Sequence, residues 1–121
     1  MPKFLNNSVL DTALNKVATG TIMVICSAQP GSRTDAVTTY ALADVALTGG
    51  DFTIANGDIS GRKVTVAQKS TITIDETGTA KFIAICDSTD LLLVTTCADQ
   101  QLIQNGTVTN PAFKYEITSP I

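Results

Sequence analysis

Three cysteines and several turn-flanking aspartates are the side chains of this sequence with the greatest capacity for chemistry. Cys86 and Cys97 each end an apolar run, KFIAIC and LLLVTTC, on either side of the polar break DSTD. A nucleophile or a metal site built on them would need helpers. The chain has no histidine, which removes the commonest partner of a catalytic thiol and the commonest metal ligand. No lysine or arginine adjoins either cysteine, and no pair has CxxC spacing.

The three thiols are therefore predicted to be reduced and buried. Cys26, Cys86 and Cys97 all end or interrupt apolar runs, where cysteine commonly packs as a small hydrophobe. The alternative is a cross-strand disulfide between Cys86 and Cys97, which would leave the third thiol free. If the two runs pair symmetrically about DSTD, Cys86 faces Leu91 and Cys97 falls opposite residue 80. That register disfavours the disulfide.

The best carboxylate candidates all adjoin turn residues: Asp51, Asp58, Asp87 and Asp90. Paired carboxylates could serve a glycosidase, and loop oxygens could hold calcium, although no D-x-D-x-D-G loop is present. The favoured interpretation is that each aspartate accepts hydrogen bonds from its own turn. No phosphate-cradling glycine motif occurs either. We expect no catalytic residue, no metal and no cofactor.

Composition excludes further classes of function. The chain has 121 residues, enough for one domain, and only 16% of them are charged. A net charge of −3 with scattered basic residues argues against a binder of nucleic acid. No apolar run is long enough to cross a membrane, and the first residues lack the apolar region of a classical export signal. We expect no nucleic-acid or membrane partner.

One segment has the pattern of a helix. In residues 8–19 the apolar side chains follow the spacing of a single helical face, with Ser8 as the expected N-cap, Asp11 in the first turn and Gly20 as the stop. Residues 1–7, MPKFLNN, are expected to form a short arm ahead of a single β-rich domain at 8–121. The arm could pair with a partner strand, or it could be a frayed terminus or fold back on its own domain.

The rest of the chain reads as short strands separated by turns. Period-two or β-branched runs recur about every ten residues, and most glycines and all four prolines fall between them. The segment 28–37 is predicted to be a polar loop, and 38–47 a strand with an irregular middle or a short helical turn. In 113–118, Phe113, Tyr115 and Ile117 are expected on one side. The predicted fold class is mainly β, an antiparallel β-sandwich or jelly-roll-like barrel with one short N-terminal α-helix.

Most of the chain resembles a family of small bacteriophage proteins encoded near capsid genes. The resemblance is carried by five stretches: NSVLDTALN (7–15), VICSAQP (24–30), TTYALADV (38–45), GDFTIANGDISGRKVTV (50–66) and TGTAKFIAICDS (77–88). None of these stretches is catalytic. The resemblance implies a virion structural protein, a head decoration or cement protein made in the bacterial cytoplasm and bound to the outside of the head shell.

The resemblance also implies partners. They are the major capsid protein and further copies of the chain itself, with a trimer as the expected homo-oligomer. The arm residues Lys3, Phe4 and Leu5 are the predicted contact with the capsid or another partner. Two rival classes stay open, a tail-associated or host-recognition module that binds through loops such as 28–37, and a small enzyme or enzyme accessory built on the aspartates.

Overall fold

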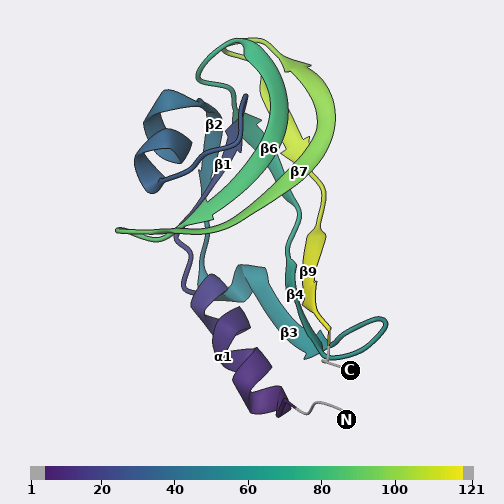
Figure 1. Ribbon diagram of the computed structural model, residues 1–121. Coiled ribbons are helices and arrows are strands. Elements are labelled where there is room, and N and C mark those ends of the chain that lie inside the picture. Colours follow the sequence, from purple (N-terminus) through teal and green to yellow (C-terminus); the bar gives the residue numbers. More distant parts are fainter. Residues whose placement is uncertain (1–4, 119–121) are drawn as a thin grey trace.

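The computed structural model describes residues 5–118 and shows a β-rich body with one α-helix near its N-terminal end (Figure 1). The helix is α1 (Asn7–Val17), followed by two short helical turns, η1 (Asp35–Thr39) and η2 (Gly49–Asp51). The strands are β1 (Ile22–Cys26), β2 (Ala41–Ala46), β3 (Phe52–Asn56), β4 (Arg62–Val66), β5 (Lys69–Thr73), β6 (Gly78–Cys86), β7 (Leu91–Leu102), β8 (Thr107–Asn110) and β9 (Phe113–Ile117).

All paired strands are antiparallel, and the predicted mainly-β, sandwich-like fold is confirmed. One sheet has the order β2-β1-β6-β7, a second has the order β3-β4-β9, and β5 pairs with β8. Antiparallel neighbours need only short turns between them, which suits a chain with frequent glycine and asparagine breaks.

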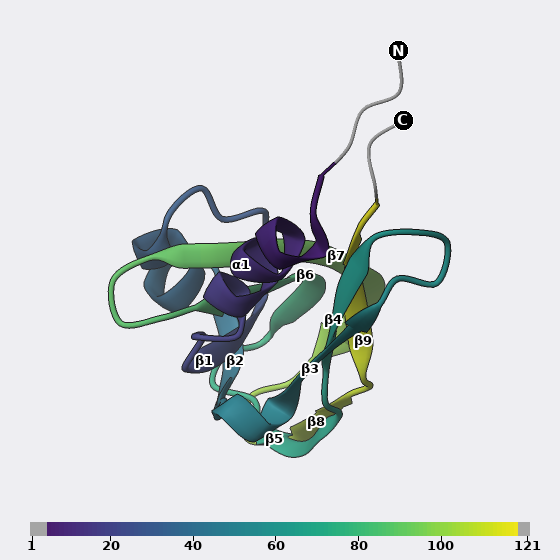
Figure 2. The ribbon, with the colours of Figure 1, turned by 90° about the horizontal axis from the view of Figure 1, so that it is seen from below.

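A joint links the first sheet to the β5–β8 pair. Ala43 of β2 forms an isolated antiparallel bridge with Ile74. The carbonyl of Leu42 accepts hydrogen bonds from the N–H groups of Asp75 and Glu76. The strands β7-β6-β1-β2-β5-β8 therefore follow one another around the core, and Figure 2 shows β6 and β7 opposite β5 and β8. Within residues 5–118, β7 and β8 are not hydrogen-bonded to each other. We call this interruption the seam.

Most buried apolar side chains share one cluster between the sheets. It includes Met23, Ile85, Val64 and Val66, all fully buried, and α1 contributes Leu14 and Val17. Val64 and Val66 face inward as their alternation predicts. A smaller cluster on the other face of the first sheet packs η1 over β1 and β6, where Cys26, Ala36 and Cys86 are fully buried.

Helix α1 differs from its prediction at both ends. Its N-cap is Asn6, whose side chain accepts from Ser8 N–H at 2.8 Å, so the expectation of Ser8 as the cap is wrong. An asparagine caps as well as a serine, and capping at Asn6 lets the helix begin one residue earlier than predicted. The helix ends before Gly20, whose φ is not positive. That glycine leaves space for Ile85, since a Cβ there would lie 2.5 Å from the Ile85 Cγ2.

The segment predicted as a polar loop contains helical backbone. Residues 33–39 form a helical turn that ends in η1, and Ala36 on this turn is completely buried against the first sheet. Arg33 Nε donates to the carbonyl of Asp87 at 2.7 Å and ties the turn to the far end of β6. The sequence pattern missed the turn because it presents a single buried residue, too few to show a helical period.

The β6–β7 hairpin departs from symmetric pairing. Cys86 faces Leu91 as predicted, but Ala80 pairs with Gln100 and not with Cys97. Two irregularities, between Ala80 and Phe82 and between Ile85 and Cys86, give β7 more residues than β6 over the same length. Bulges of this kind are not visible in an apolar pattern, because they add a residue without changing the composition.

Two features near the C-terminal end were also predicted incompletely. Strand β8 was not predicted, because TVTN is short and contains a single large apolar residue. On β9, Phe113 and Ile117 pack against the core, whereas Tyr115 between them is 45% exposed. The period of two therefore predicts the strand correctly, but only two of its three apolar side chains pack against the core.

Candidate functional site

Of the three predicted contact residues, Lys3 and Phe4 lie outside the described residues. Leu5 is described, and it lies immediately before α1 with 39% of its surface exposed. A second exposed apolar side chain, Val9, follows one turn into the helix. The start of α1 therefore presents apolar surface to solvent, beside the arm where the sequence predicts a contact.

The turn between β3 and β4 lies at the same end of the molecule (Figure 1). Its tip carries Ile59, which is 88% exposed, the most exposed of the large apolar side chains described. We call Leu5, Val9 and Ile59 the contact end. Ile59 was not predictable as a contact residue, because one isoleucine inside NGDISG does not disturb a turn pattern.

Ion pairs and hydrogen bonds hold the elements of the contact end together. Arg62 at the start of β4 bridges α1 and the sheet, with its Nε 2.7 Å from Asp11 Oδ1 and its Nη1 2.7 Å from Asn56 Oδ1. The prediction that Asp11 lies in the first turn is wrong, because the helix already begins at Asn7 and no acidic residue lies in its first turn. Asp11 instead fastens α1 to β4. The bidentate reach of the guanidinium suits this bridging position.

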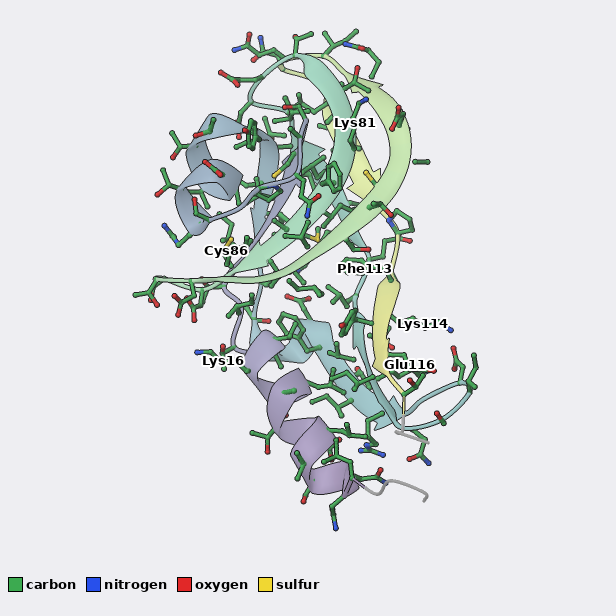
Figure 3. The ribbon with its side chains drawn as sticks, viewed as in Figure 1. Lys16, Lys81, Cys86, Phe113, Lys114 and Glu116 are labelled. Atoms are coloured by element: carbon green, nitrogen blue, oxygen red, sulfur yellow. The ribbon has the colours of Figure 1, made fainter. Side chains whose placement is uncertain are left out.

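The β3–β4 turn is fastened to β9 as well. Asp58 accepts from Lys63 Nζ at 2.7 Å and from Lys114 Nζ, while its own N–H donates to the Glu116 carboxylate. Figure 3 shows Lys114 and Glu116 on β9 beside this turn. The hydrogen bonds from the two lysines lower the pKa of Asp58 to about 2. Gly57 is required here, because a Cβ would lie 2.1 Å from the Ser60 carbonyl oxygen.

The other aspartates mostly do the turn chemistry predicted for them. Asp87 Oδ1 accepts from Thr89 N–H at 2.8 Å and from Asp90 N–H at 2.6 Å, and these bonds lower the pKa of Asp87 to about 2. Asp51 forms a reciprocal capping box with Thr48. Asp58 is the exception, since its carboxylate pairs with lysines from two strands.

The three cysteines are all free, and the disulfide alternative is therefore wrong. Cys26 and Cys86 are fully buried, and burial raises the pKa of the Cys26 thiol to about 12. Figure 3 shows Cys86 near the end of β6. Cys97 is only partly buried, and desolvation followed by the charge of Asp99 raises the pKa of its thiol too. All three are poor nucleophiles near neutral pH.

Comparison with protein-family models, curated proteins and solved structures gives no match for this chain. Within residues 5–118, no group of three or more cysteine, aspartate or glutamate side chains is placed to hold a metal ion. None of the helices in this part of the chain combines the length and the apolar character that a membrane crossing requires. The contact end and the seam are the two surface features that the geometry sets apart.

Proposed function

We propose that this protein is a bacteriophage head decoration protein, which binds the outside of the capsid shell and stabilises it without catalysis. The class of particle comes from the sequence resemblance. The observation that carries the contact itself is the contact end. Three of the five large apolar side chains exposed within residues 5–118 lie there, at the start of α1 and on the β3–β4 turn. Single exposed apolar residues are ordinary, but a group of them at one end indicates a surface that a partner covers.

A cement protein must present its contact surface rigidly, because ordering a flexible segment on binding reduces affinity. The contact end meets this requirement in its described residues. Helix α1 is fixed to β4 through the pair of Arg62 with Asp11, and the β3–β4 turn is fixed to β9 through Asp58. The three apolar side chains of the contact end take no part in these ion pairs and remain exposed to a partner. The proposed partners are the major capsid protein and further copies of the chain in a trimer.

The test is binding to particles that lack this protein. Wild-type protein is mixed with naked heads, the heads are sedimented, and the bound fraction and the heat resistance of the heads are measured. Wild type should bind saturably and raise the temperature at which the heads disrupt. Ile59→Asp should weaken binding by roughly ten-fold or more, because burying an isoleucine contributes about 1.5–3 kcal/mol that an aspartate would lose.

The matched control is Ile103→Asp. Ile103 is 66% exposed in the turn after β7, at the end of the molecule opposite α1 (Figure 1), so the same change in charge and polarity is made away from the contact end. This variant should bind heads like wild type. Absence of wild-type binding to naked heads would overturn the proposed function. Equal losses from Ile59→Asp and Ile103→Asp would overturn the contact end as the site.

A further inference from the structure

The seam contains a cavity of about 430 Å³. Consecutive residues line it on both sides, 95–98 on β7 and 108–111 along and just after β8. Successive side chains of a strand point to opposite faces, so consecutive lining residues mean that the backbone edges themselves form the walls. Neither edge is hydrogen-bonded to another described strand on this side. The cavity is therefore bounded by two strand edges that pair with no described strand on this side.

The floor of the cavity is apolar. It is made by Ile25 of β1, Ala80 and Ile83 of β6 and Leu102 of β7, all of them buried. The volume lies within the range of about 300–1,000 Å³ typical of ligand sites. An occupant must therefore satisfy backbone hydrogen bonds at its edges and place an apolar group against the floor.

The charges around the cavity favour a neutral occupant. Lys114 is the one lining residue that carries a charge, and its Nζ already pairs with Asp58 away from the floor. The Cys97 thiol also lines the cavity and stays protonated near neutral pH, because burial opposes the thiolate. No lining group is left to neutralise an incoming charge.

Asn110 provides a hydrogen-bonding group inside the cavity. It is 7% exposed, the one buried polar residue in the described chain, and it lines the cavity. Its Nδ2 donates to Met23 Sδ at 3.5 Å, and thioether sulfur is a weak acceptor. Its Oδ1 accepts no hydrogen bond from residues 5–118. Every fully buried side-chain nitrogen or oxygen in this range has a partner, so Oδ1 must retain some contact with solvent. The carboxamide oxygen is therefore available to accept a hydrogen bond from a peptide N–H.

We propose that the seam binds a short, neutral, extended peptide segment, which adds as a strand between β7 and β8. Strand addition supplies main-chain hydrogen bonds at an open edge and lets alternate side chains enter a pocket. Here one edge of the added strand hydrogen-bonds to β7 and the other to β8. Its inward side chain lies on the cavity floor beside Asn110. This inference is independent of the proposed function.

The probe is the neutral pentapeptide acetyl-Thr-Val-Thr-Val-Thr-amide, and the readout is alkylation of Cys97 by iodoacetamide at about pH 9. Cys26 and Cys86 are fully buried and serve as internal references that should not react in the folded protein. Saturating peptide should slow alkylation of Cys97 at least ten-fold. The same peptide methylated on alternate backbone nitrogens should not protect, because it lacks the donors that an edge requires.

Two variants keep the test decisive. Ala80→Leu fills the cavity from its floor and should abolish protection by the peptide. Asn110→Leu keeps a similar side-chain volume and removes the amide, so it should weaken binding by about three- to ten-fold. Thermal melting of both variants checks that they remain folded. An unchanged rate of Cys97 alkylation with the peptide, or equal protection by the methylated peptide, would overturn the proposal. Binding of Ala80→Leu to naked heads at the wild-type level would show that the proposed function does not depend on the seam.

Discussion

The two strands of the β6–β7 hairpin contain similar apolar runs, KFIAIC and LLLVTTC, but their cysteines lie in different surroundings. Cys86 on β6 is completely buried in the smaller core cluster, between the sheet and η1. Cys97 on β7 lines the open seam. The difference follows from position in the sheet, since β6 has a hydrogen-bonded neighbour on both sides and β7 has one on a single side. An apolar run alone therefore does not distinguish a sealed strand from an edge strand that borders a cavity.

The bulge between Ala80 and Phe82 produces a second contrast within β6 itself. Beyond it, Ile83 and Ile85 face the main cluster, and Ala84 and Cys86 face the smaller one. Ala80 also faces the main cluster, although simple alternation from Ile83 would turn it to the other side. The bulge thus directs Ala80 into the seam and makes it part of the cavity floor.

Truncation of a core side chain that does not line the seam cavity should have the largest effect on stability. Ile85→Ala removes a fully buried side chain from a tightly packed site and should cost about 3–5 kcal/mol of unfolding free energy. Ile83→Ala on the same face should cost at least about 1 kcal/mol less, because Ile83 already borders a cavity and its loss opens no new sealed void. Urea denaturation measures both. Equal losses of unfolding free energy from the two variants would mean that the core beside the seam is packed as tightly as the core around Ile85.

Enlarging two alanines of β6 should have opposite effects. Ala84 is fully buried and does not line the seam cavity, so Ala84→Leu should destabilise the protein by about 1–3 kcal/mol through overpacking. Ala80→Leu has cavity volume to fill and should leave stability unchanged or raise it by up to about 1 kcal/mol. Thermal melts of the two variants at one pH provide the comparison. A larger loss from Ala80→Leu than from Ala84→Leu would contradict it.

The smallest effect is expected at the β2–β5 joint, which closes the ring of strands on the side away from the seam. Partial desolvation, followed by the charge of nearby Asp75, raises the pKa of Asp44, beside the bridge residue Ala43. A raised pKa means that the folded state holds the proton more tightly, so this group's contribution to stability is present below its unfolded pKa of 3.8 and is lost as pH rises through the folded pKa.

Asp44→Asn should therefore stabilise the protein at pH 7 and have little effect at pH 3. The gain should be no more than about 0.5 kcal/mol, because the residue is exposed and solvent screens the repulsion. Urea denaturation at both pH values measures it. A gain of equal size at pH 3 would show that charge repulsion at the joint is not its cause.

Periodicity and punctuation in the sequence were sufficient to predict the fold class, the helix and the buried face of β4. These features depend on local alternation, which a sequence displays directly. The register of β7, the buried turn at 33–39 and the seam were not predictable in this way. Each depends on which strands become neighbours, and bulges and edge positions leave no mark in composition.

The contact residues were predictable in part. The apolar arm indicated Leu5, whose side chain is exposed, while Lys3 and Phe4 lie outside the described residues. Ile59 became a candidate only once the fold placed the β3–β4 turn at the same end as the start of α1. Turn aspartates were easier, because the hydrogen bonds of Asp87 are local and follow from its neighbours.

The most direct test of the central claim is electron cryo-microscopy of naked phage heads after addition of the purified protein. The proposed function predicts ordered density on the outer surface of the shell, with α1 and the β3–β4 turn against the capsid protein and the β7–β8 turn pointing away from it. Density confined to the tail would support the host-recognition alternative. Heads without added density, even with the protein in large molar excess over capsid subunits, would contradict the account.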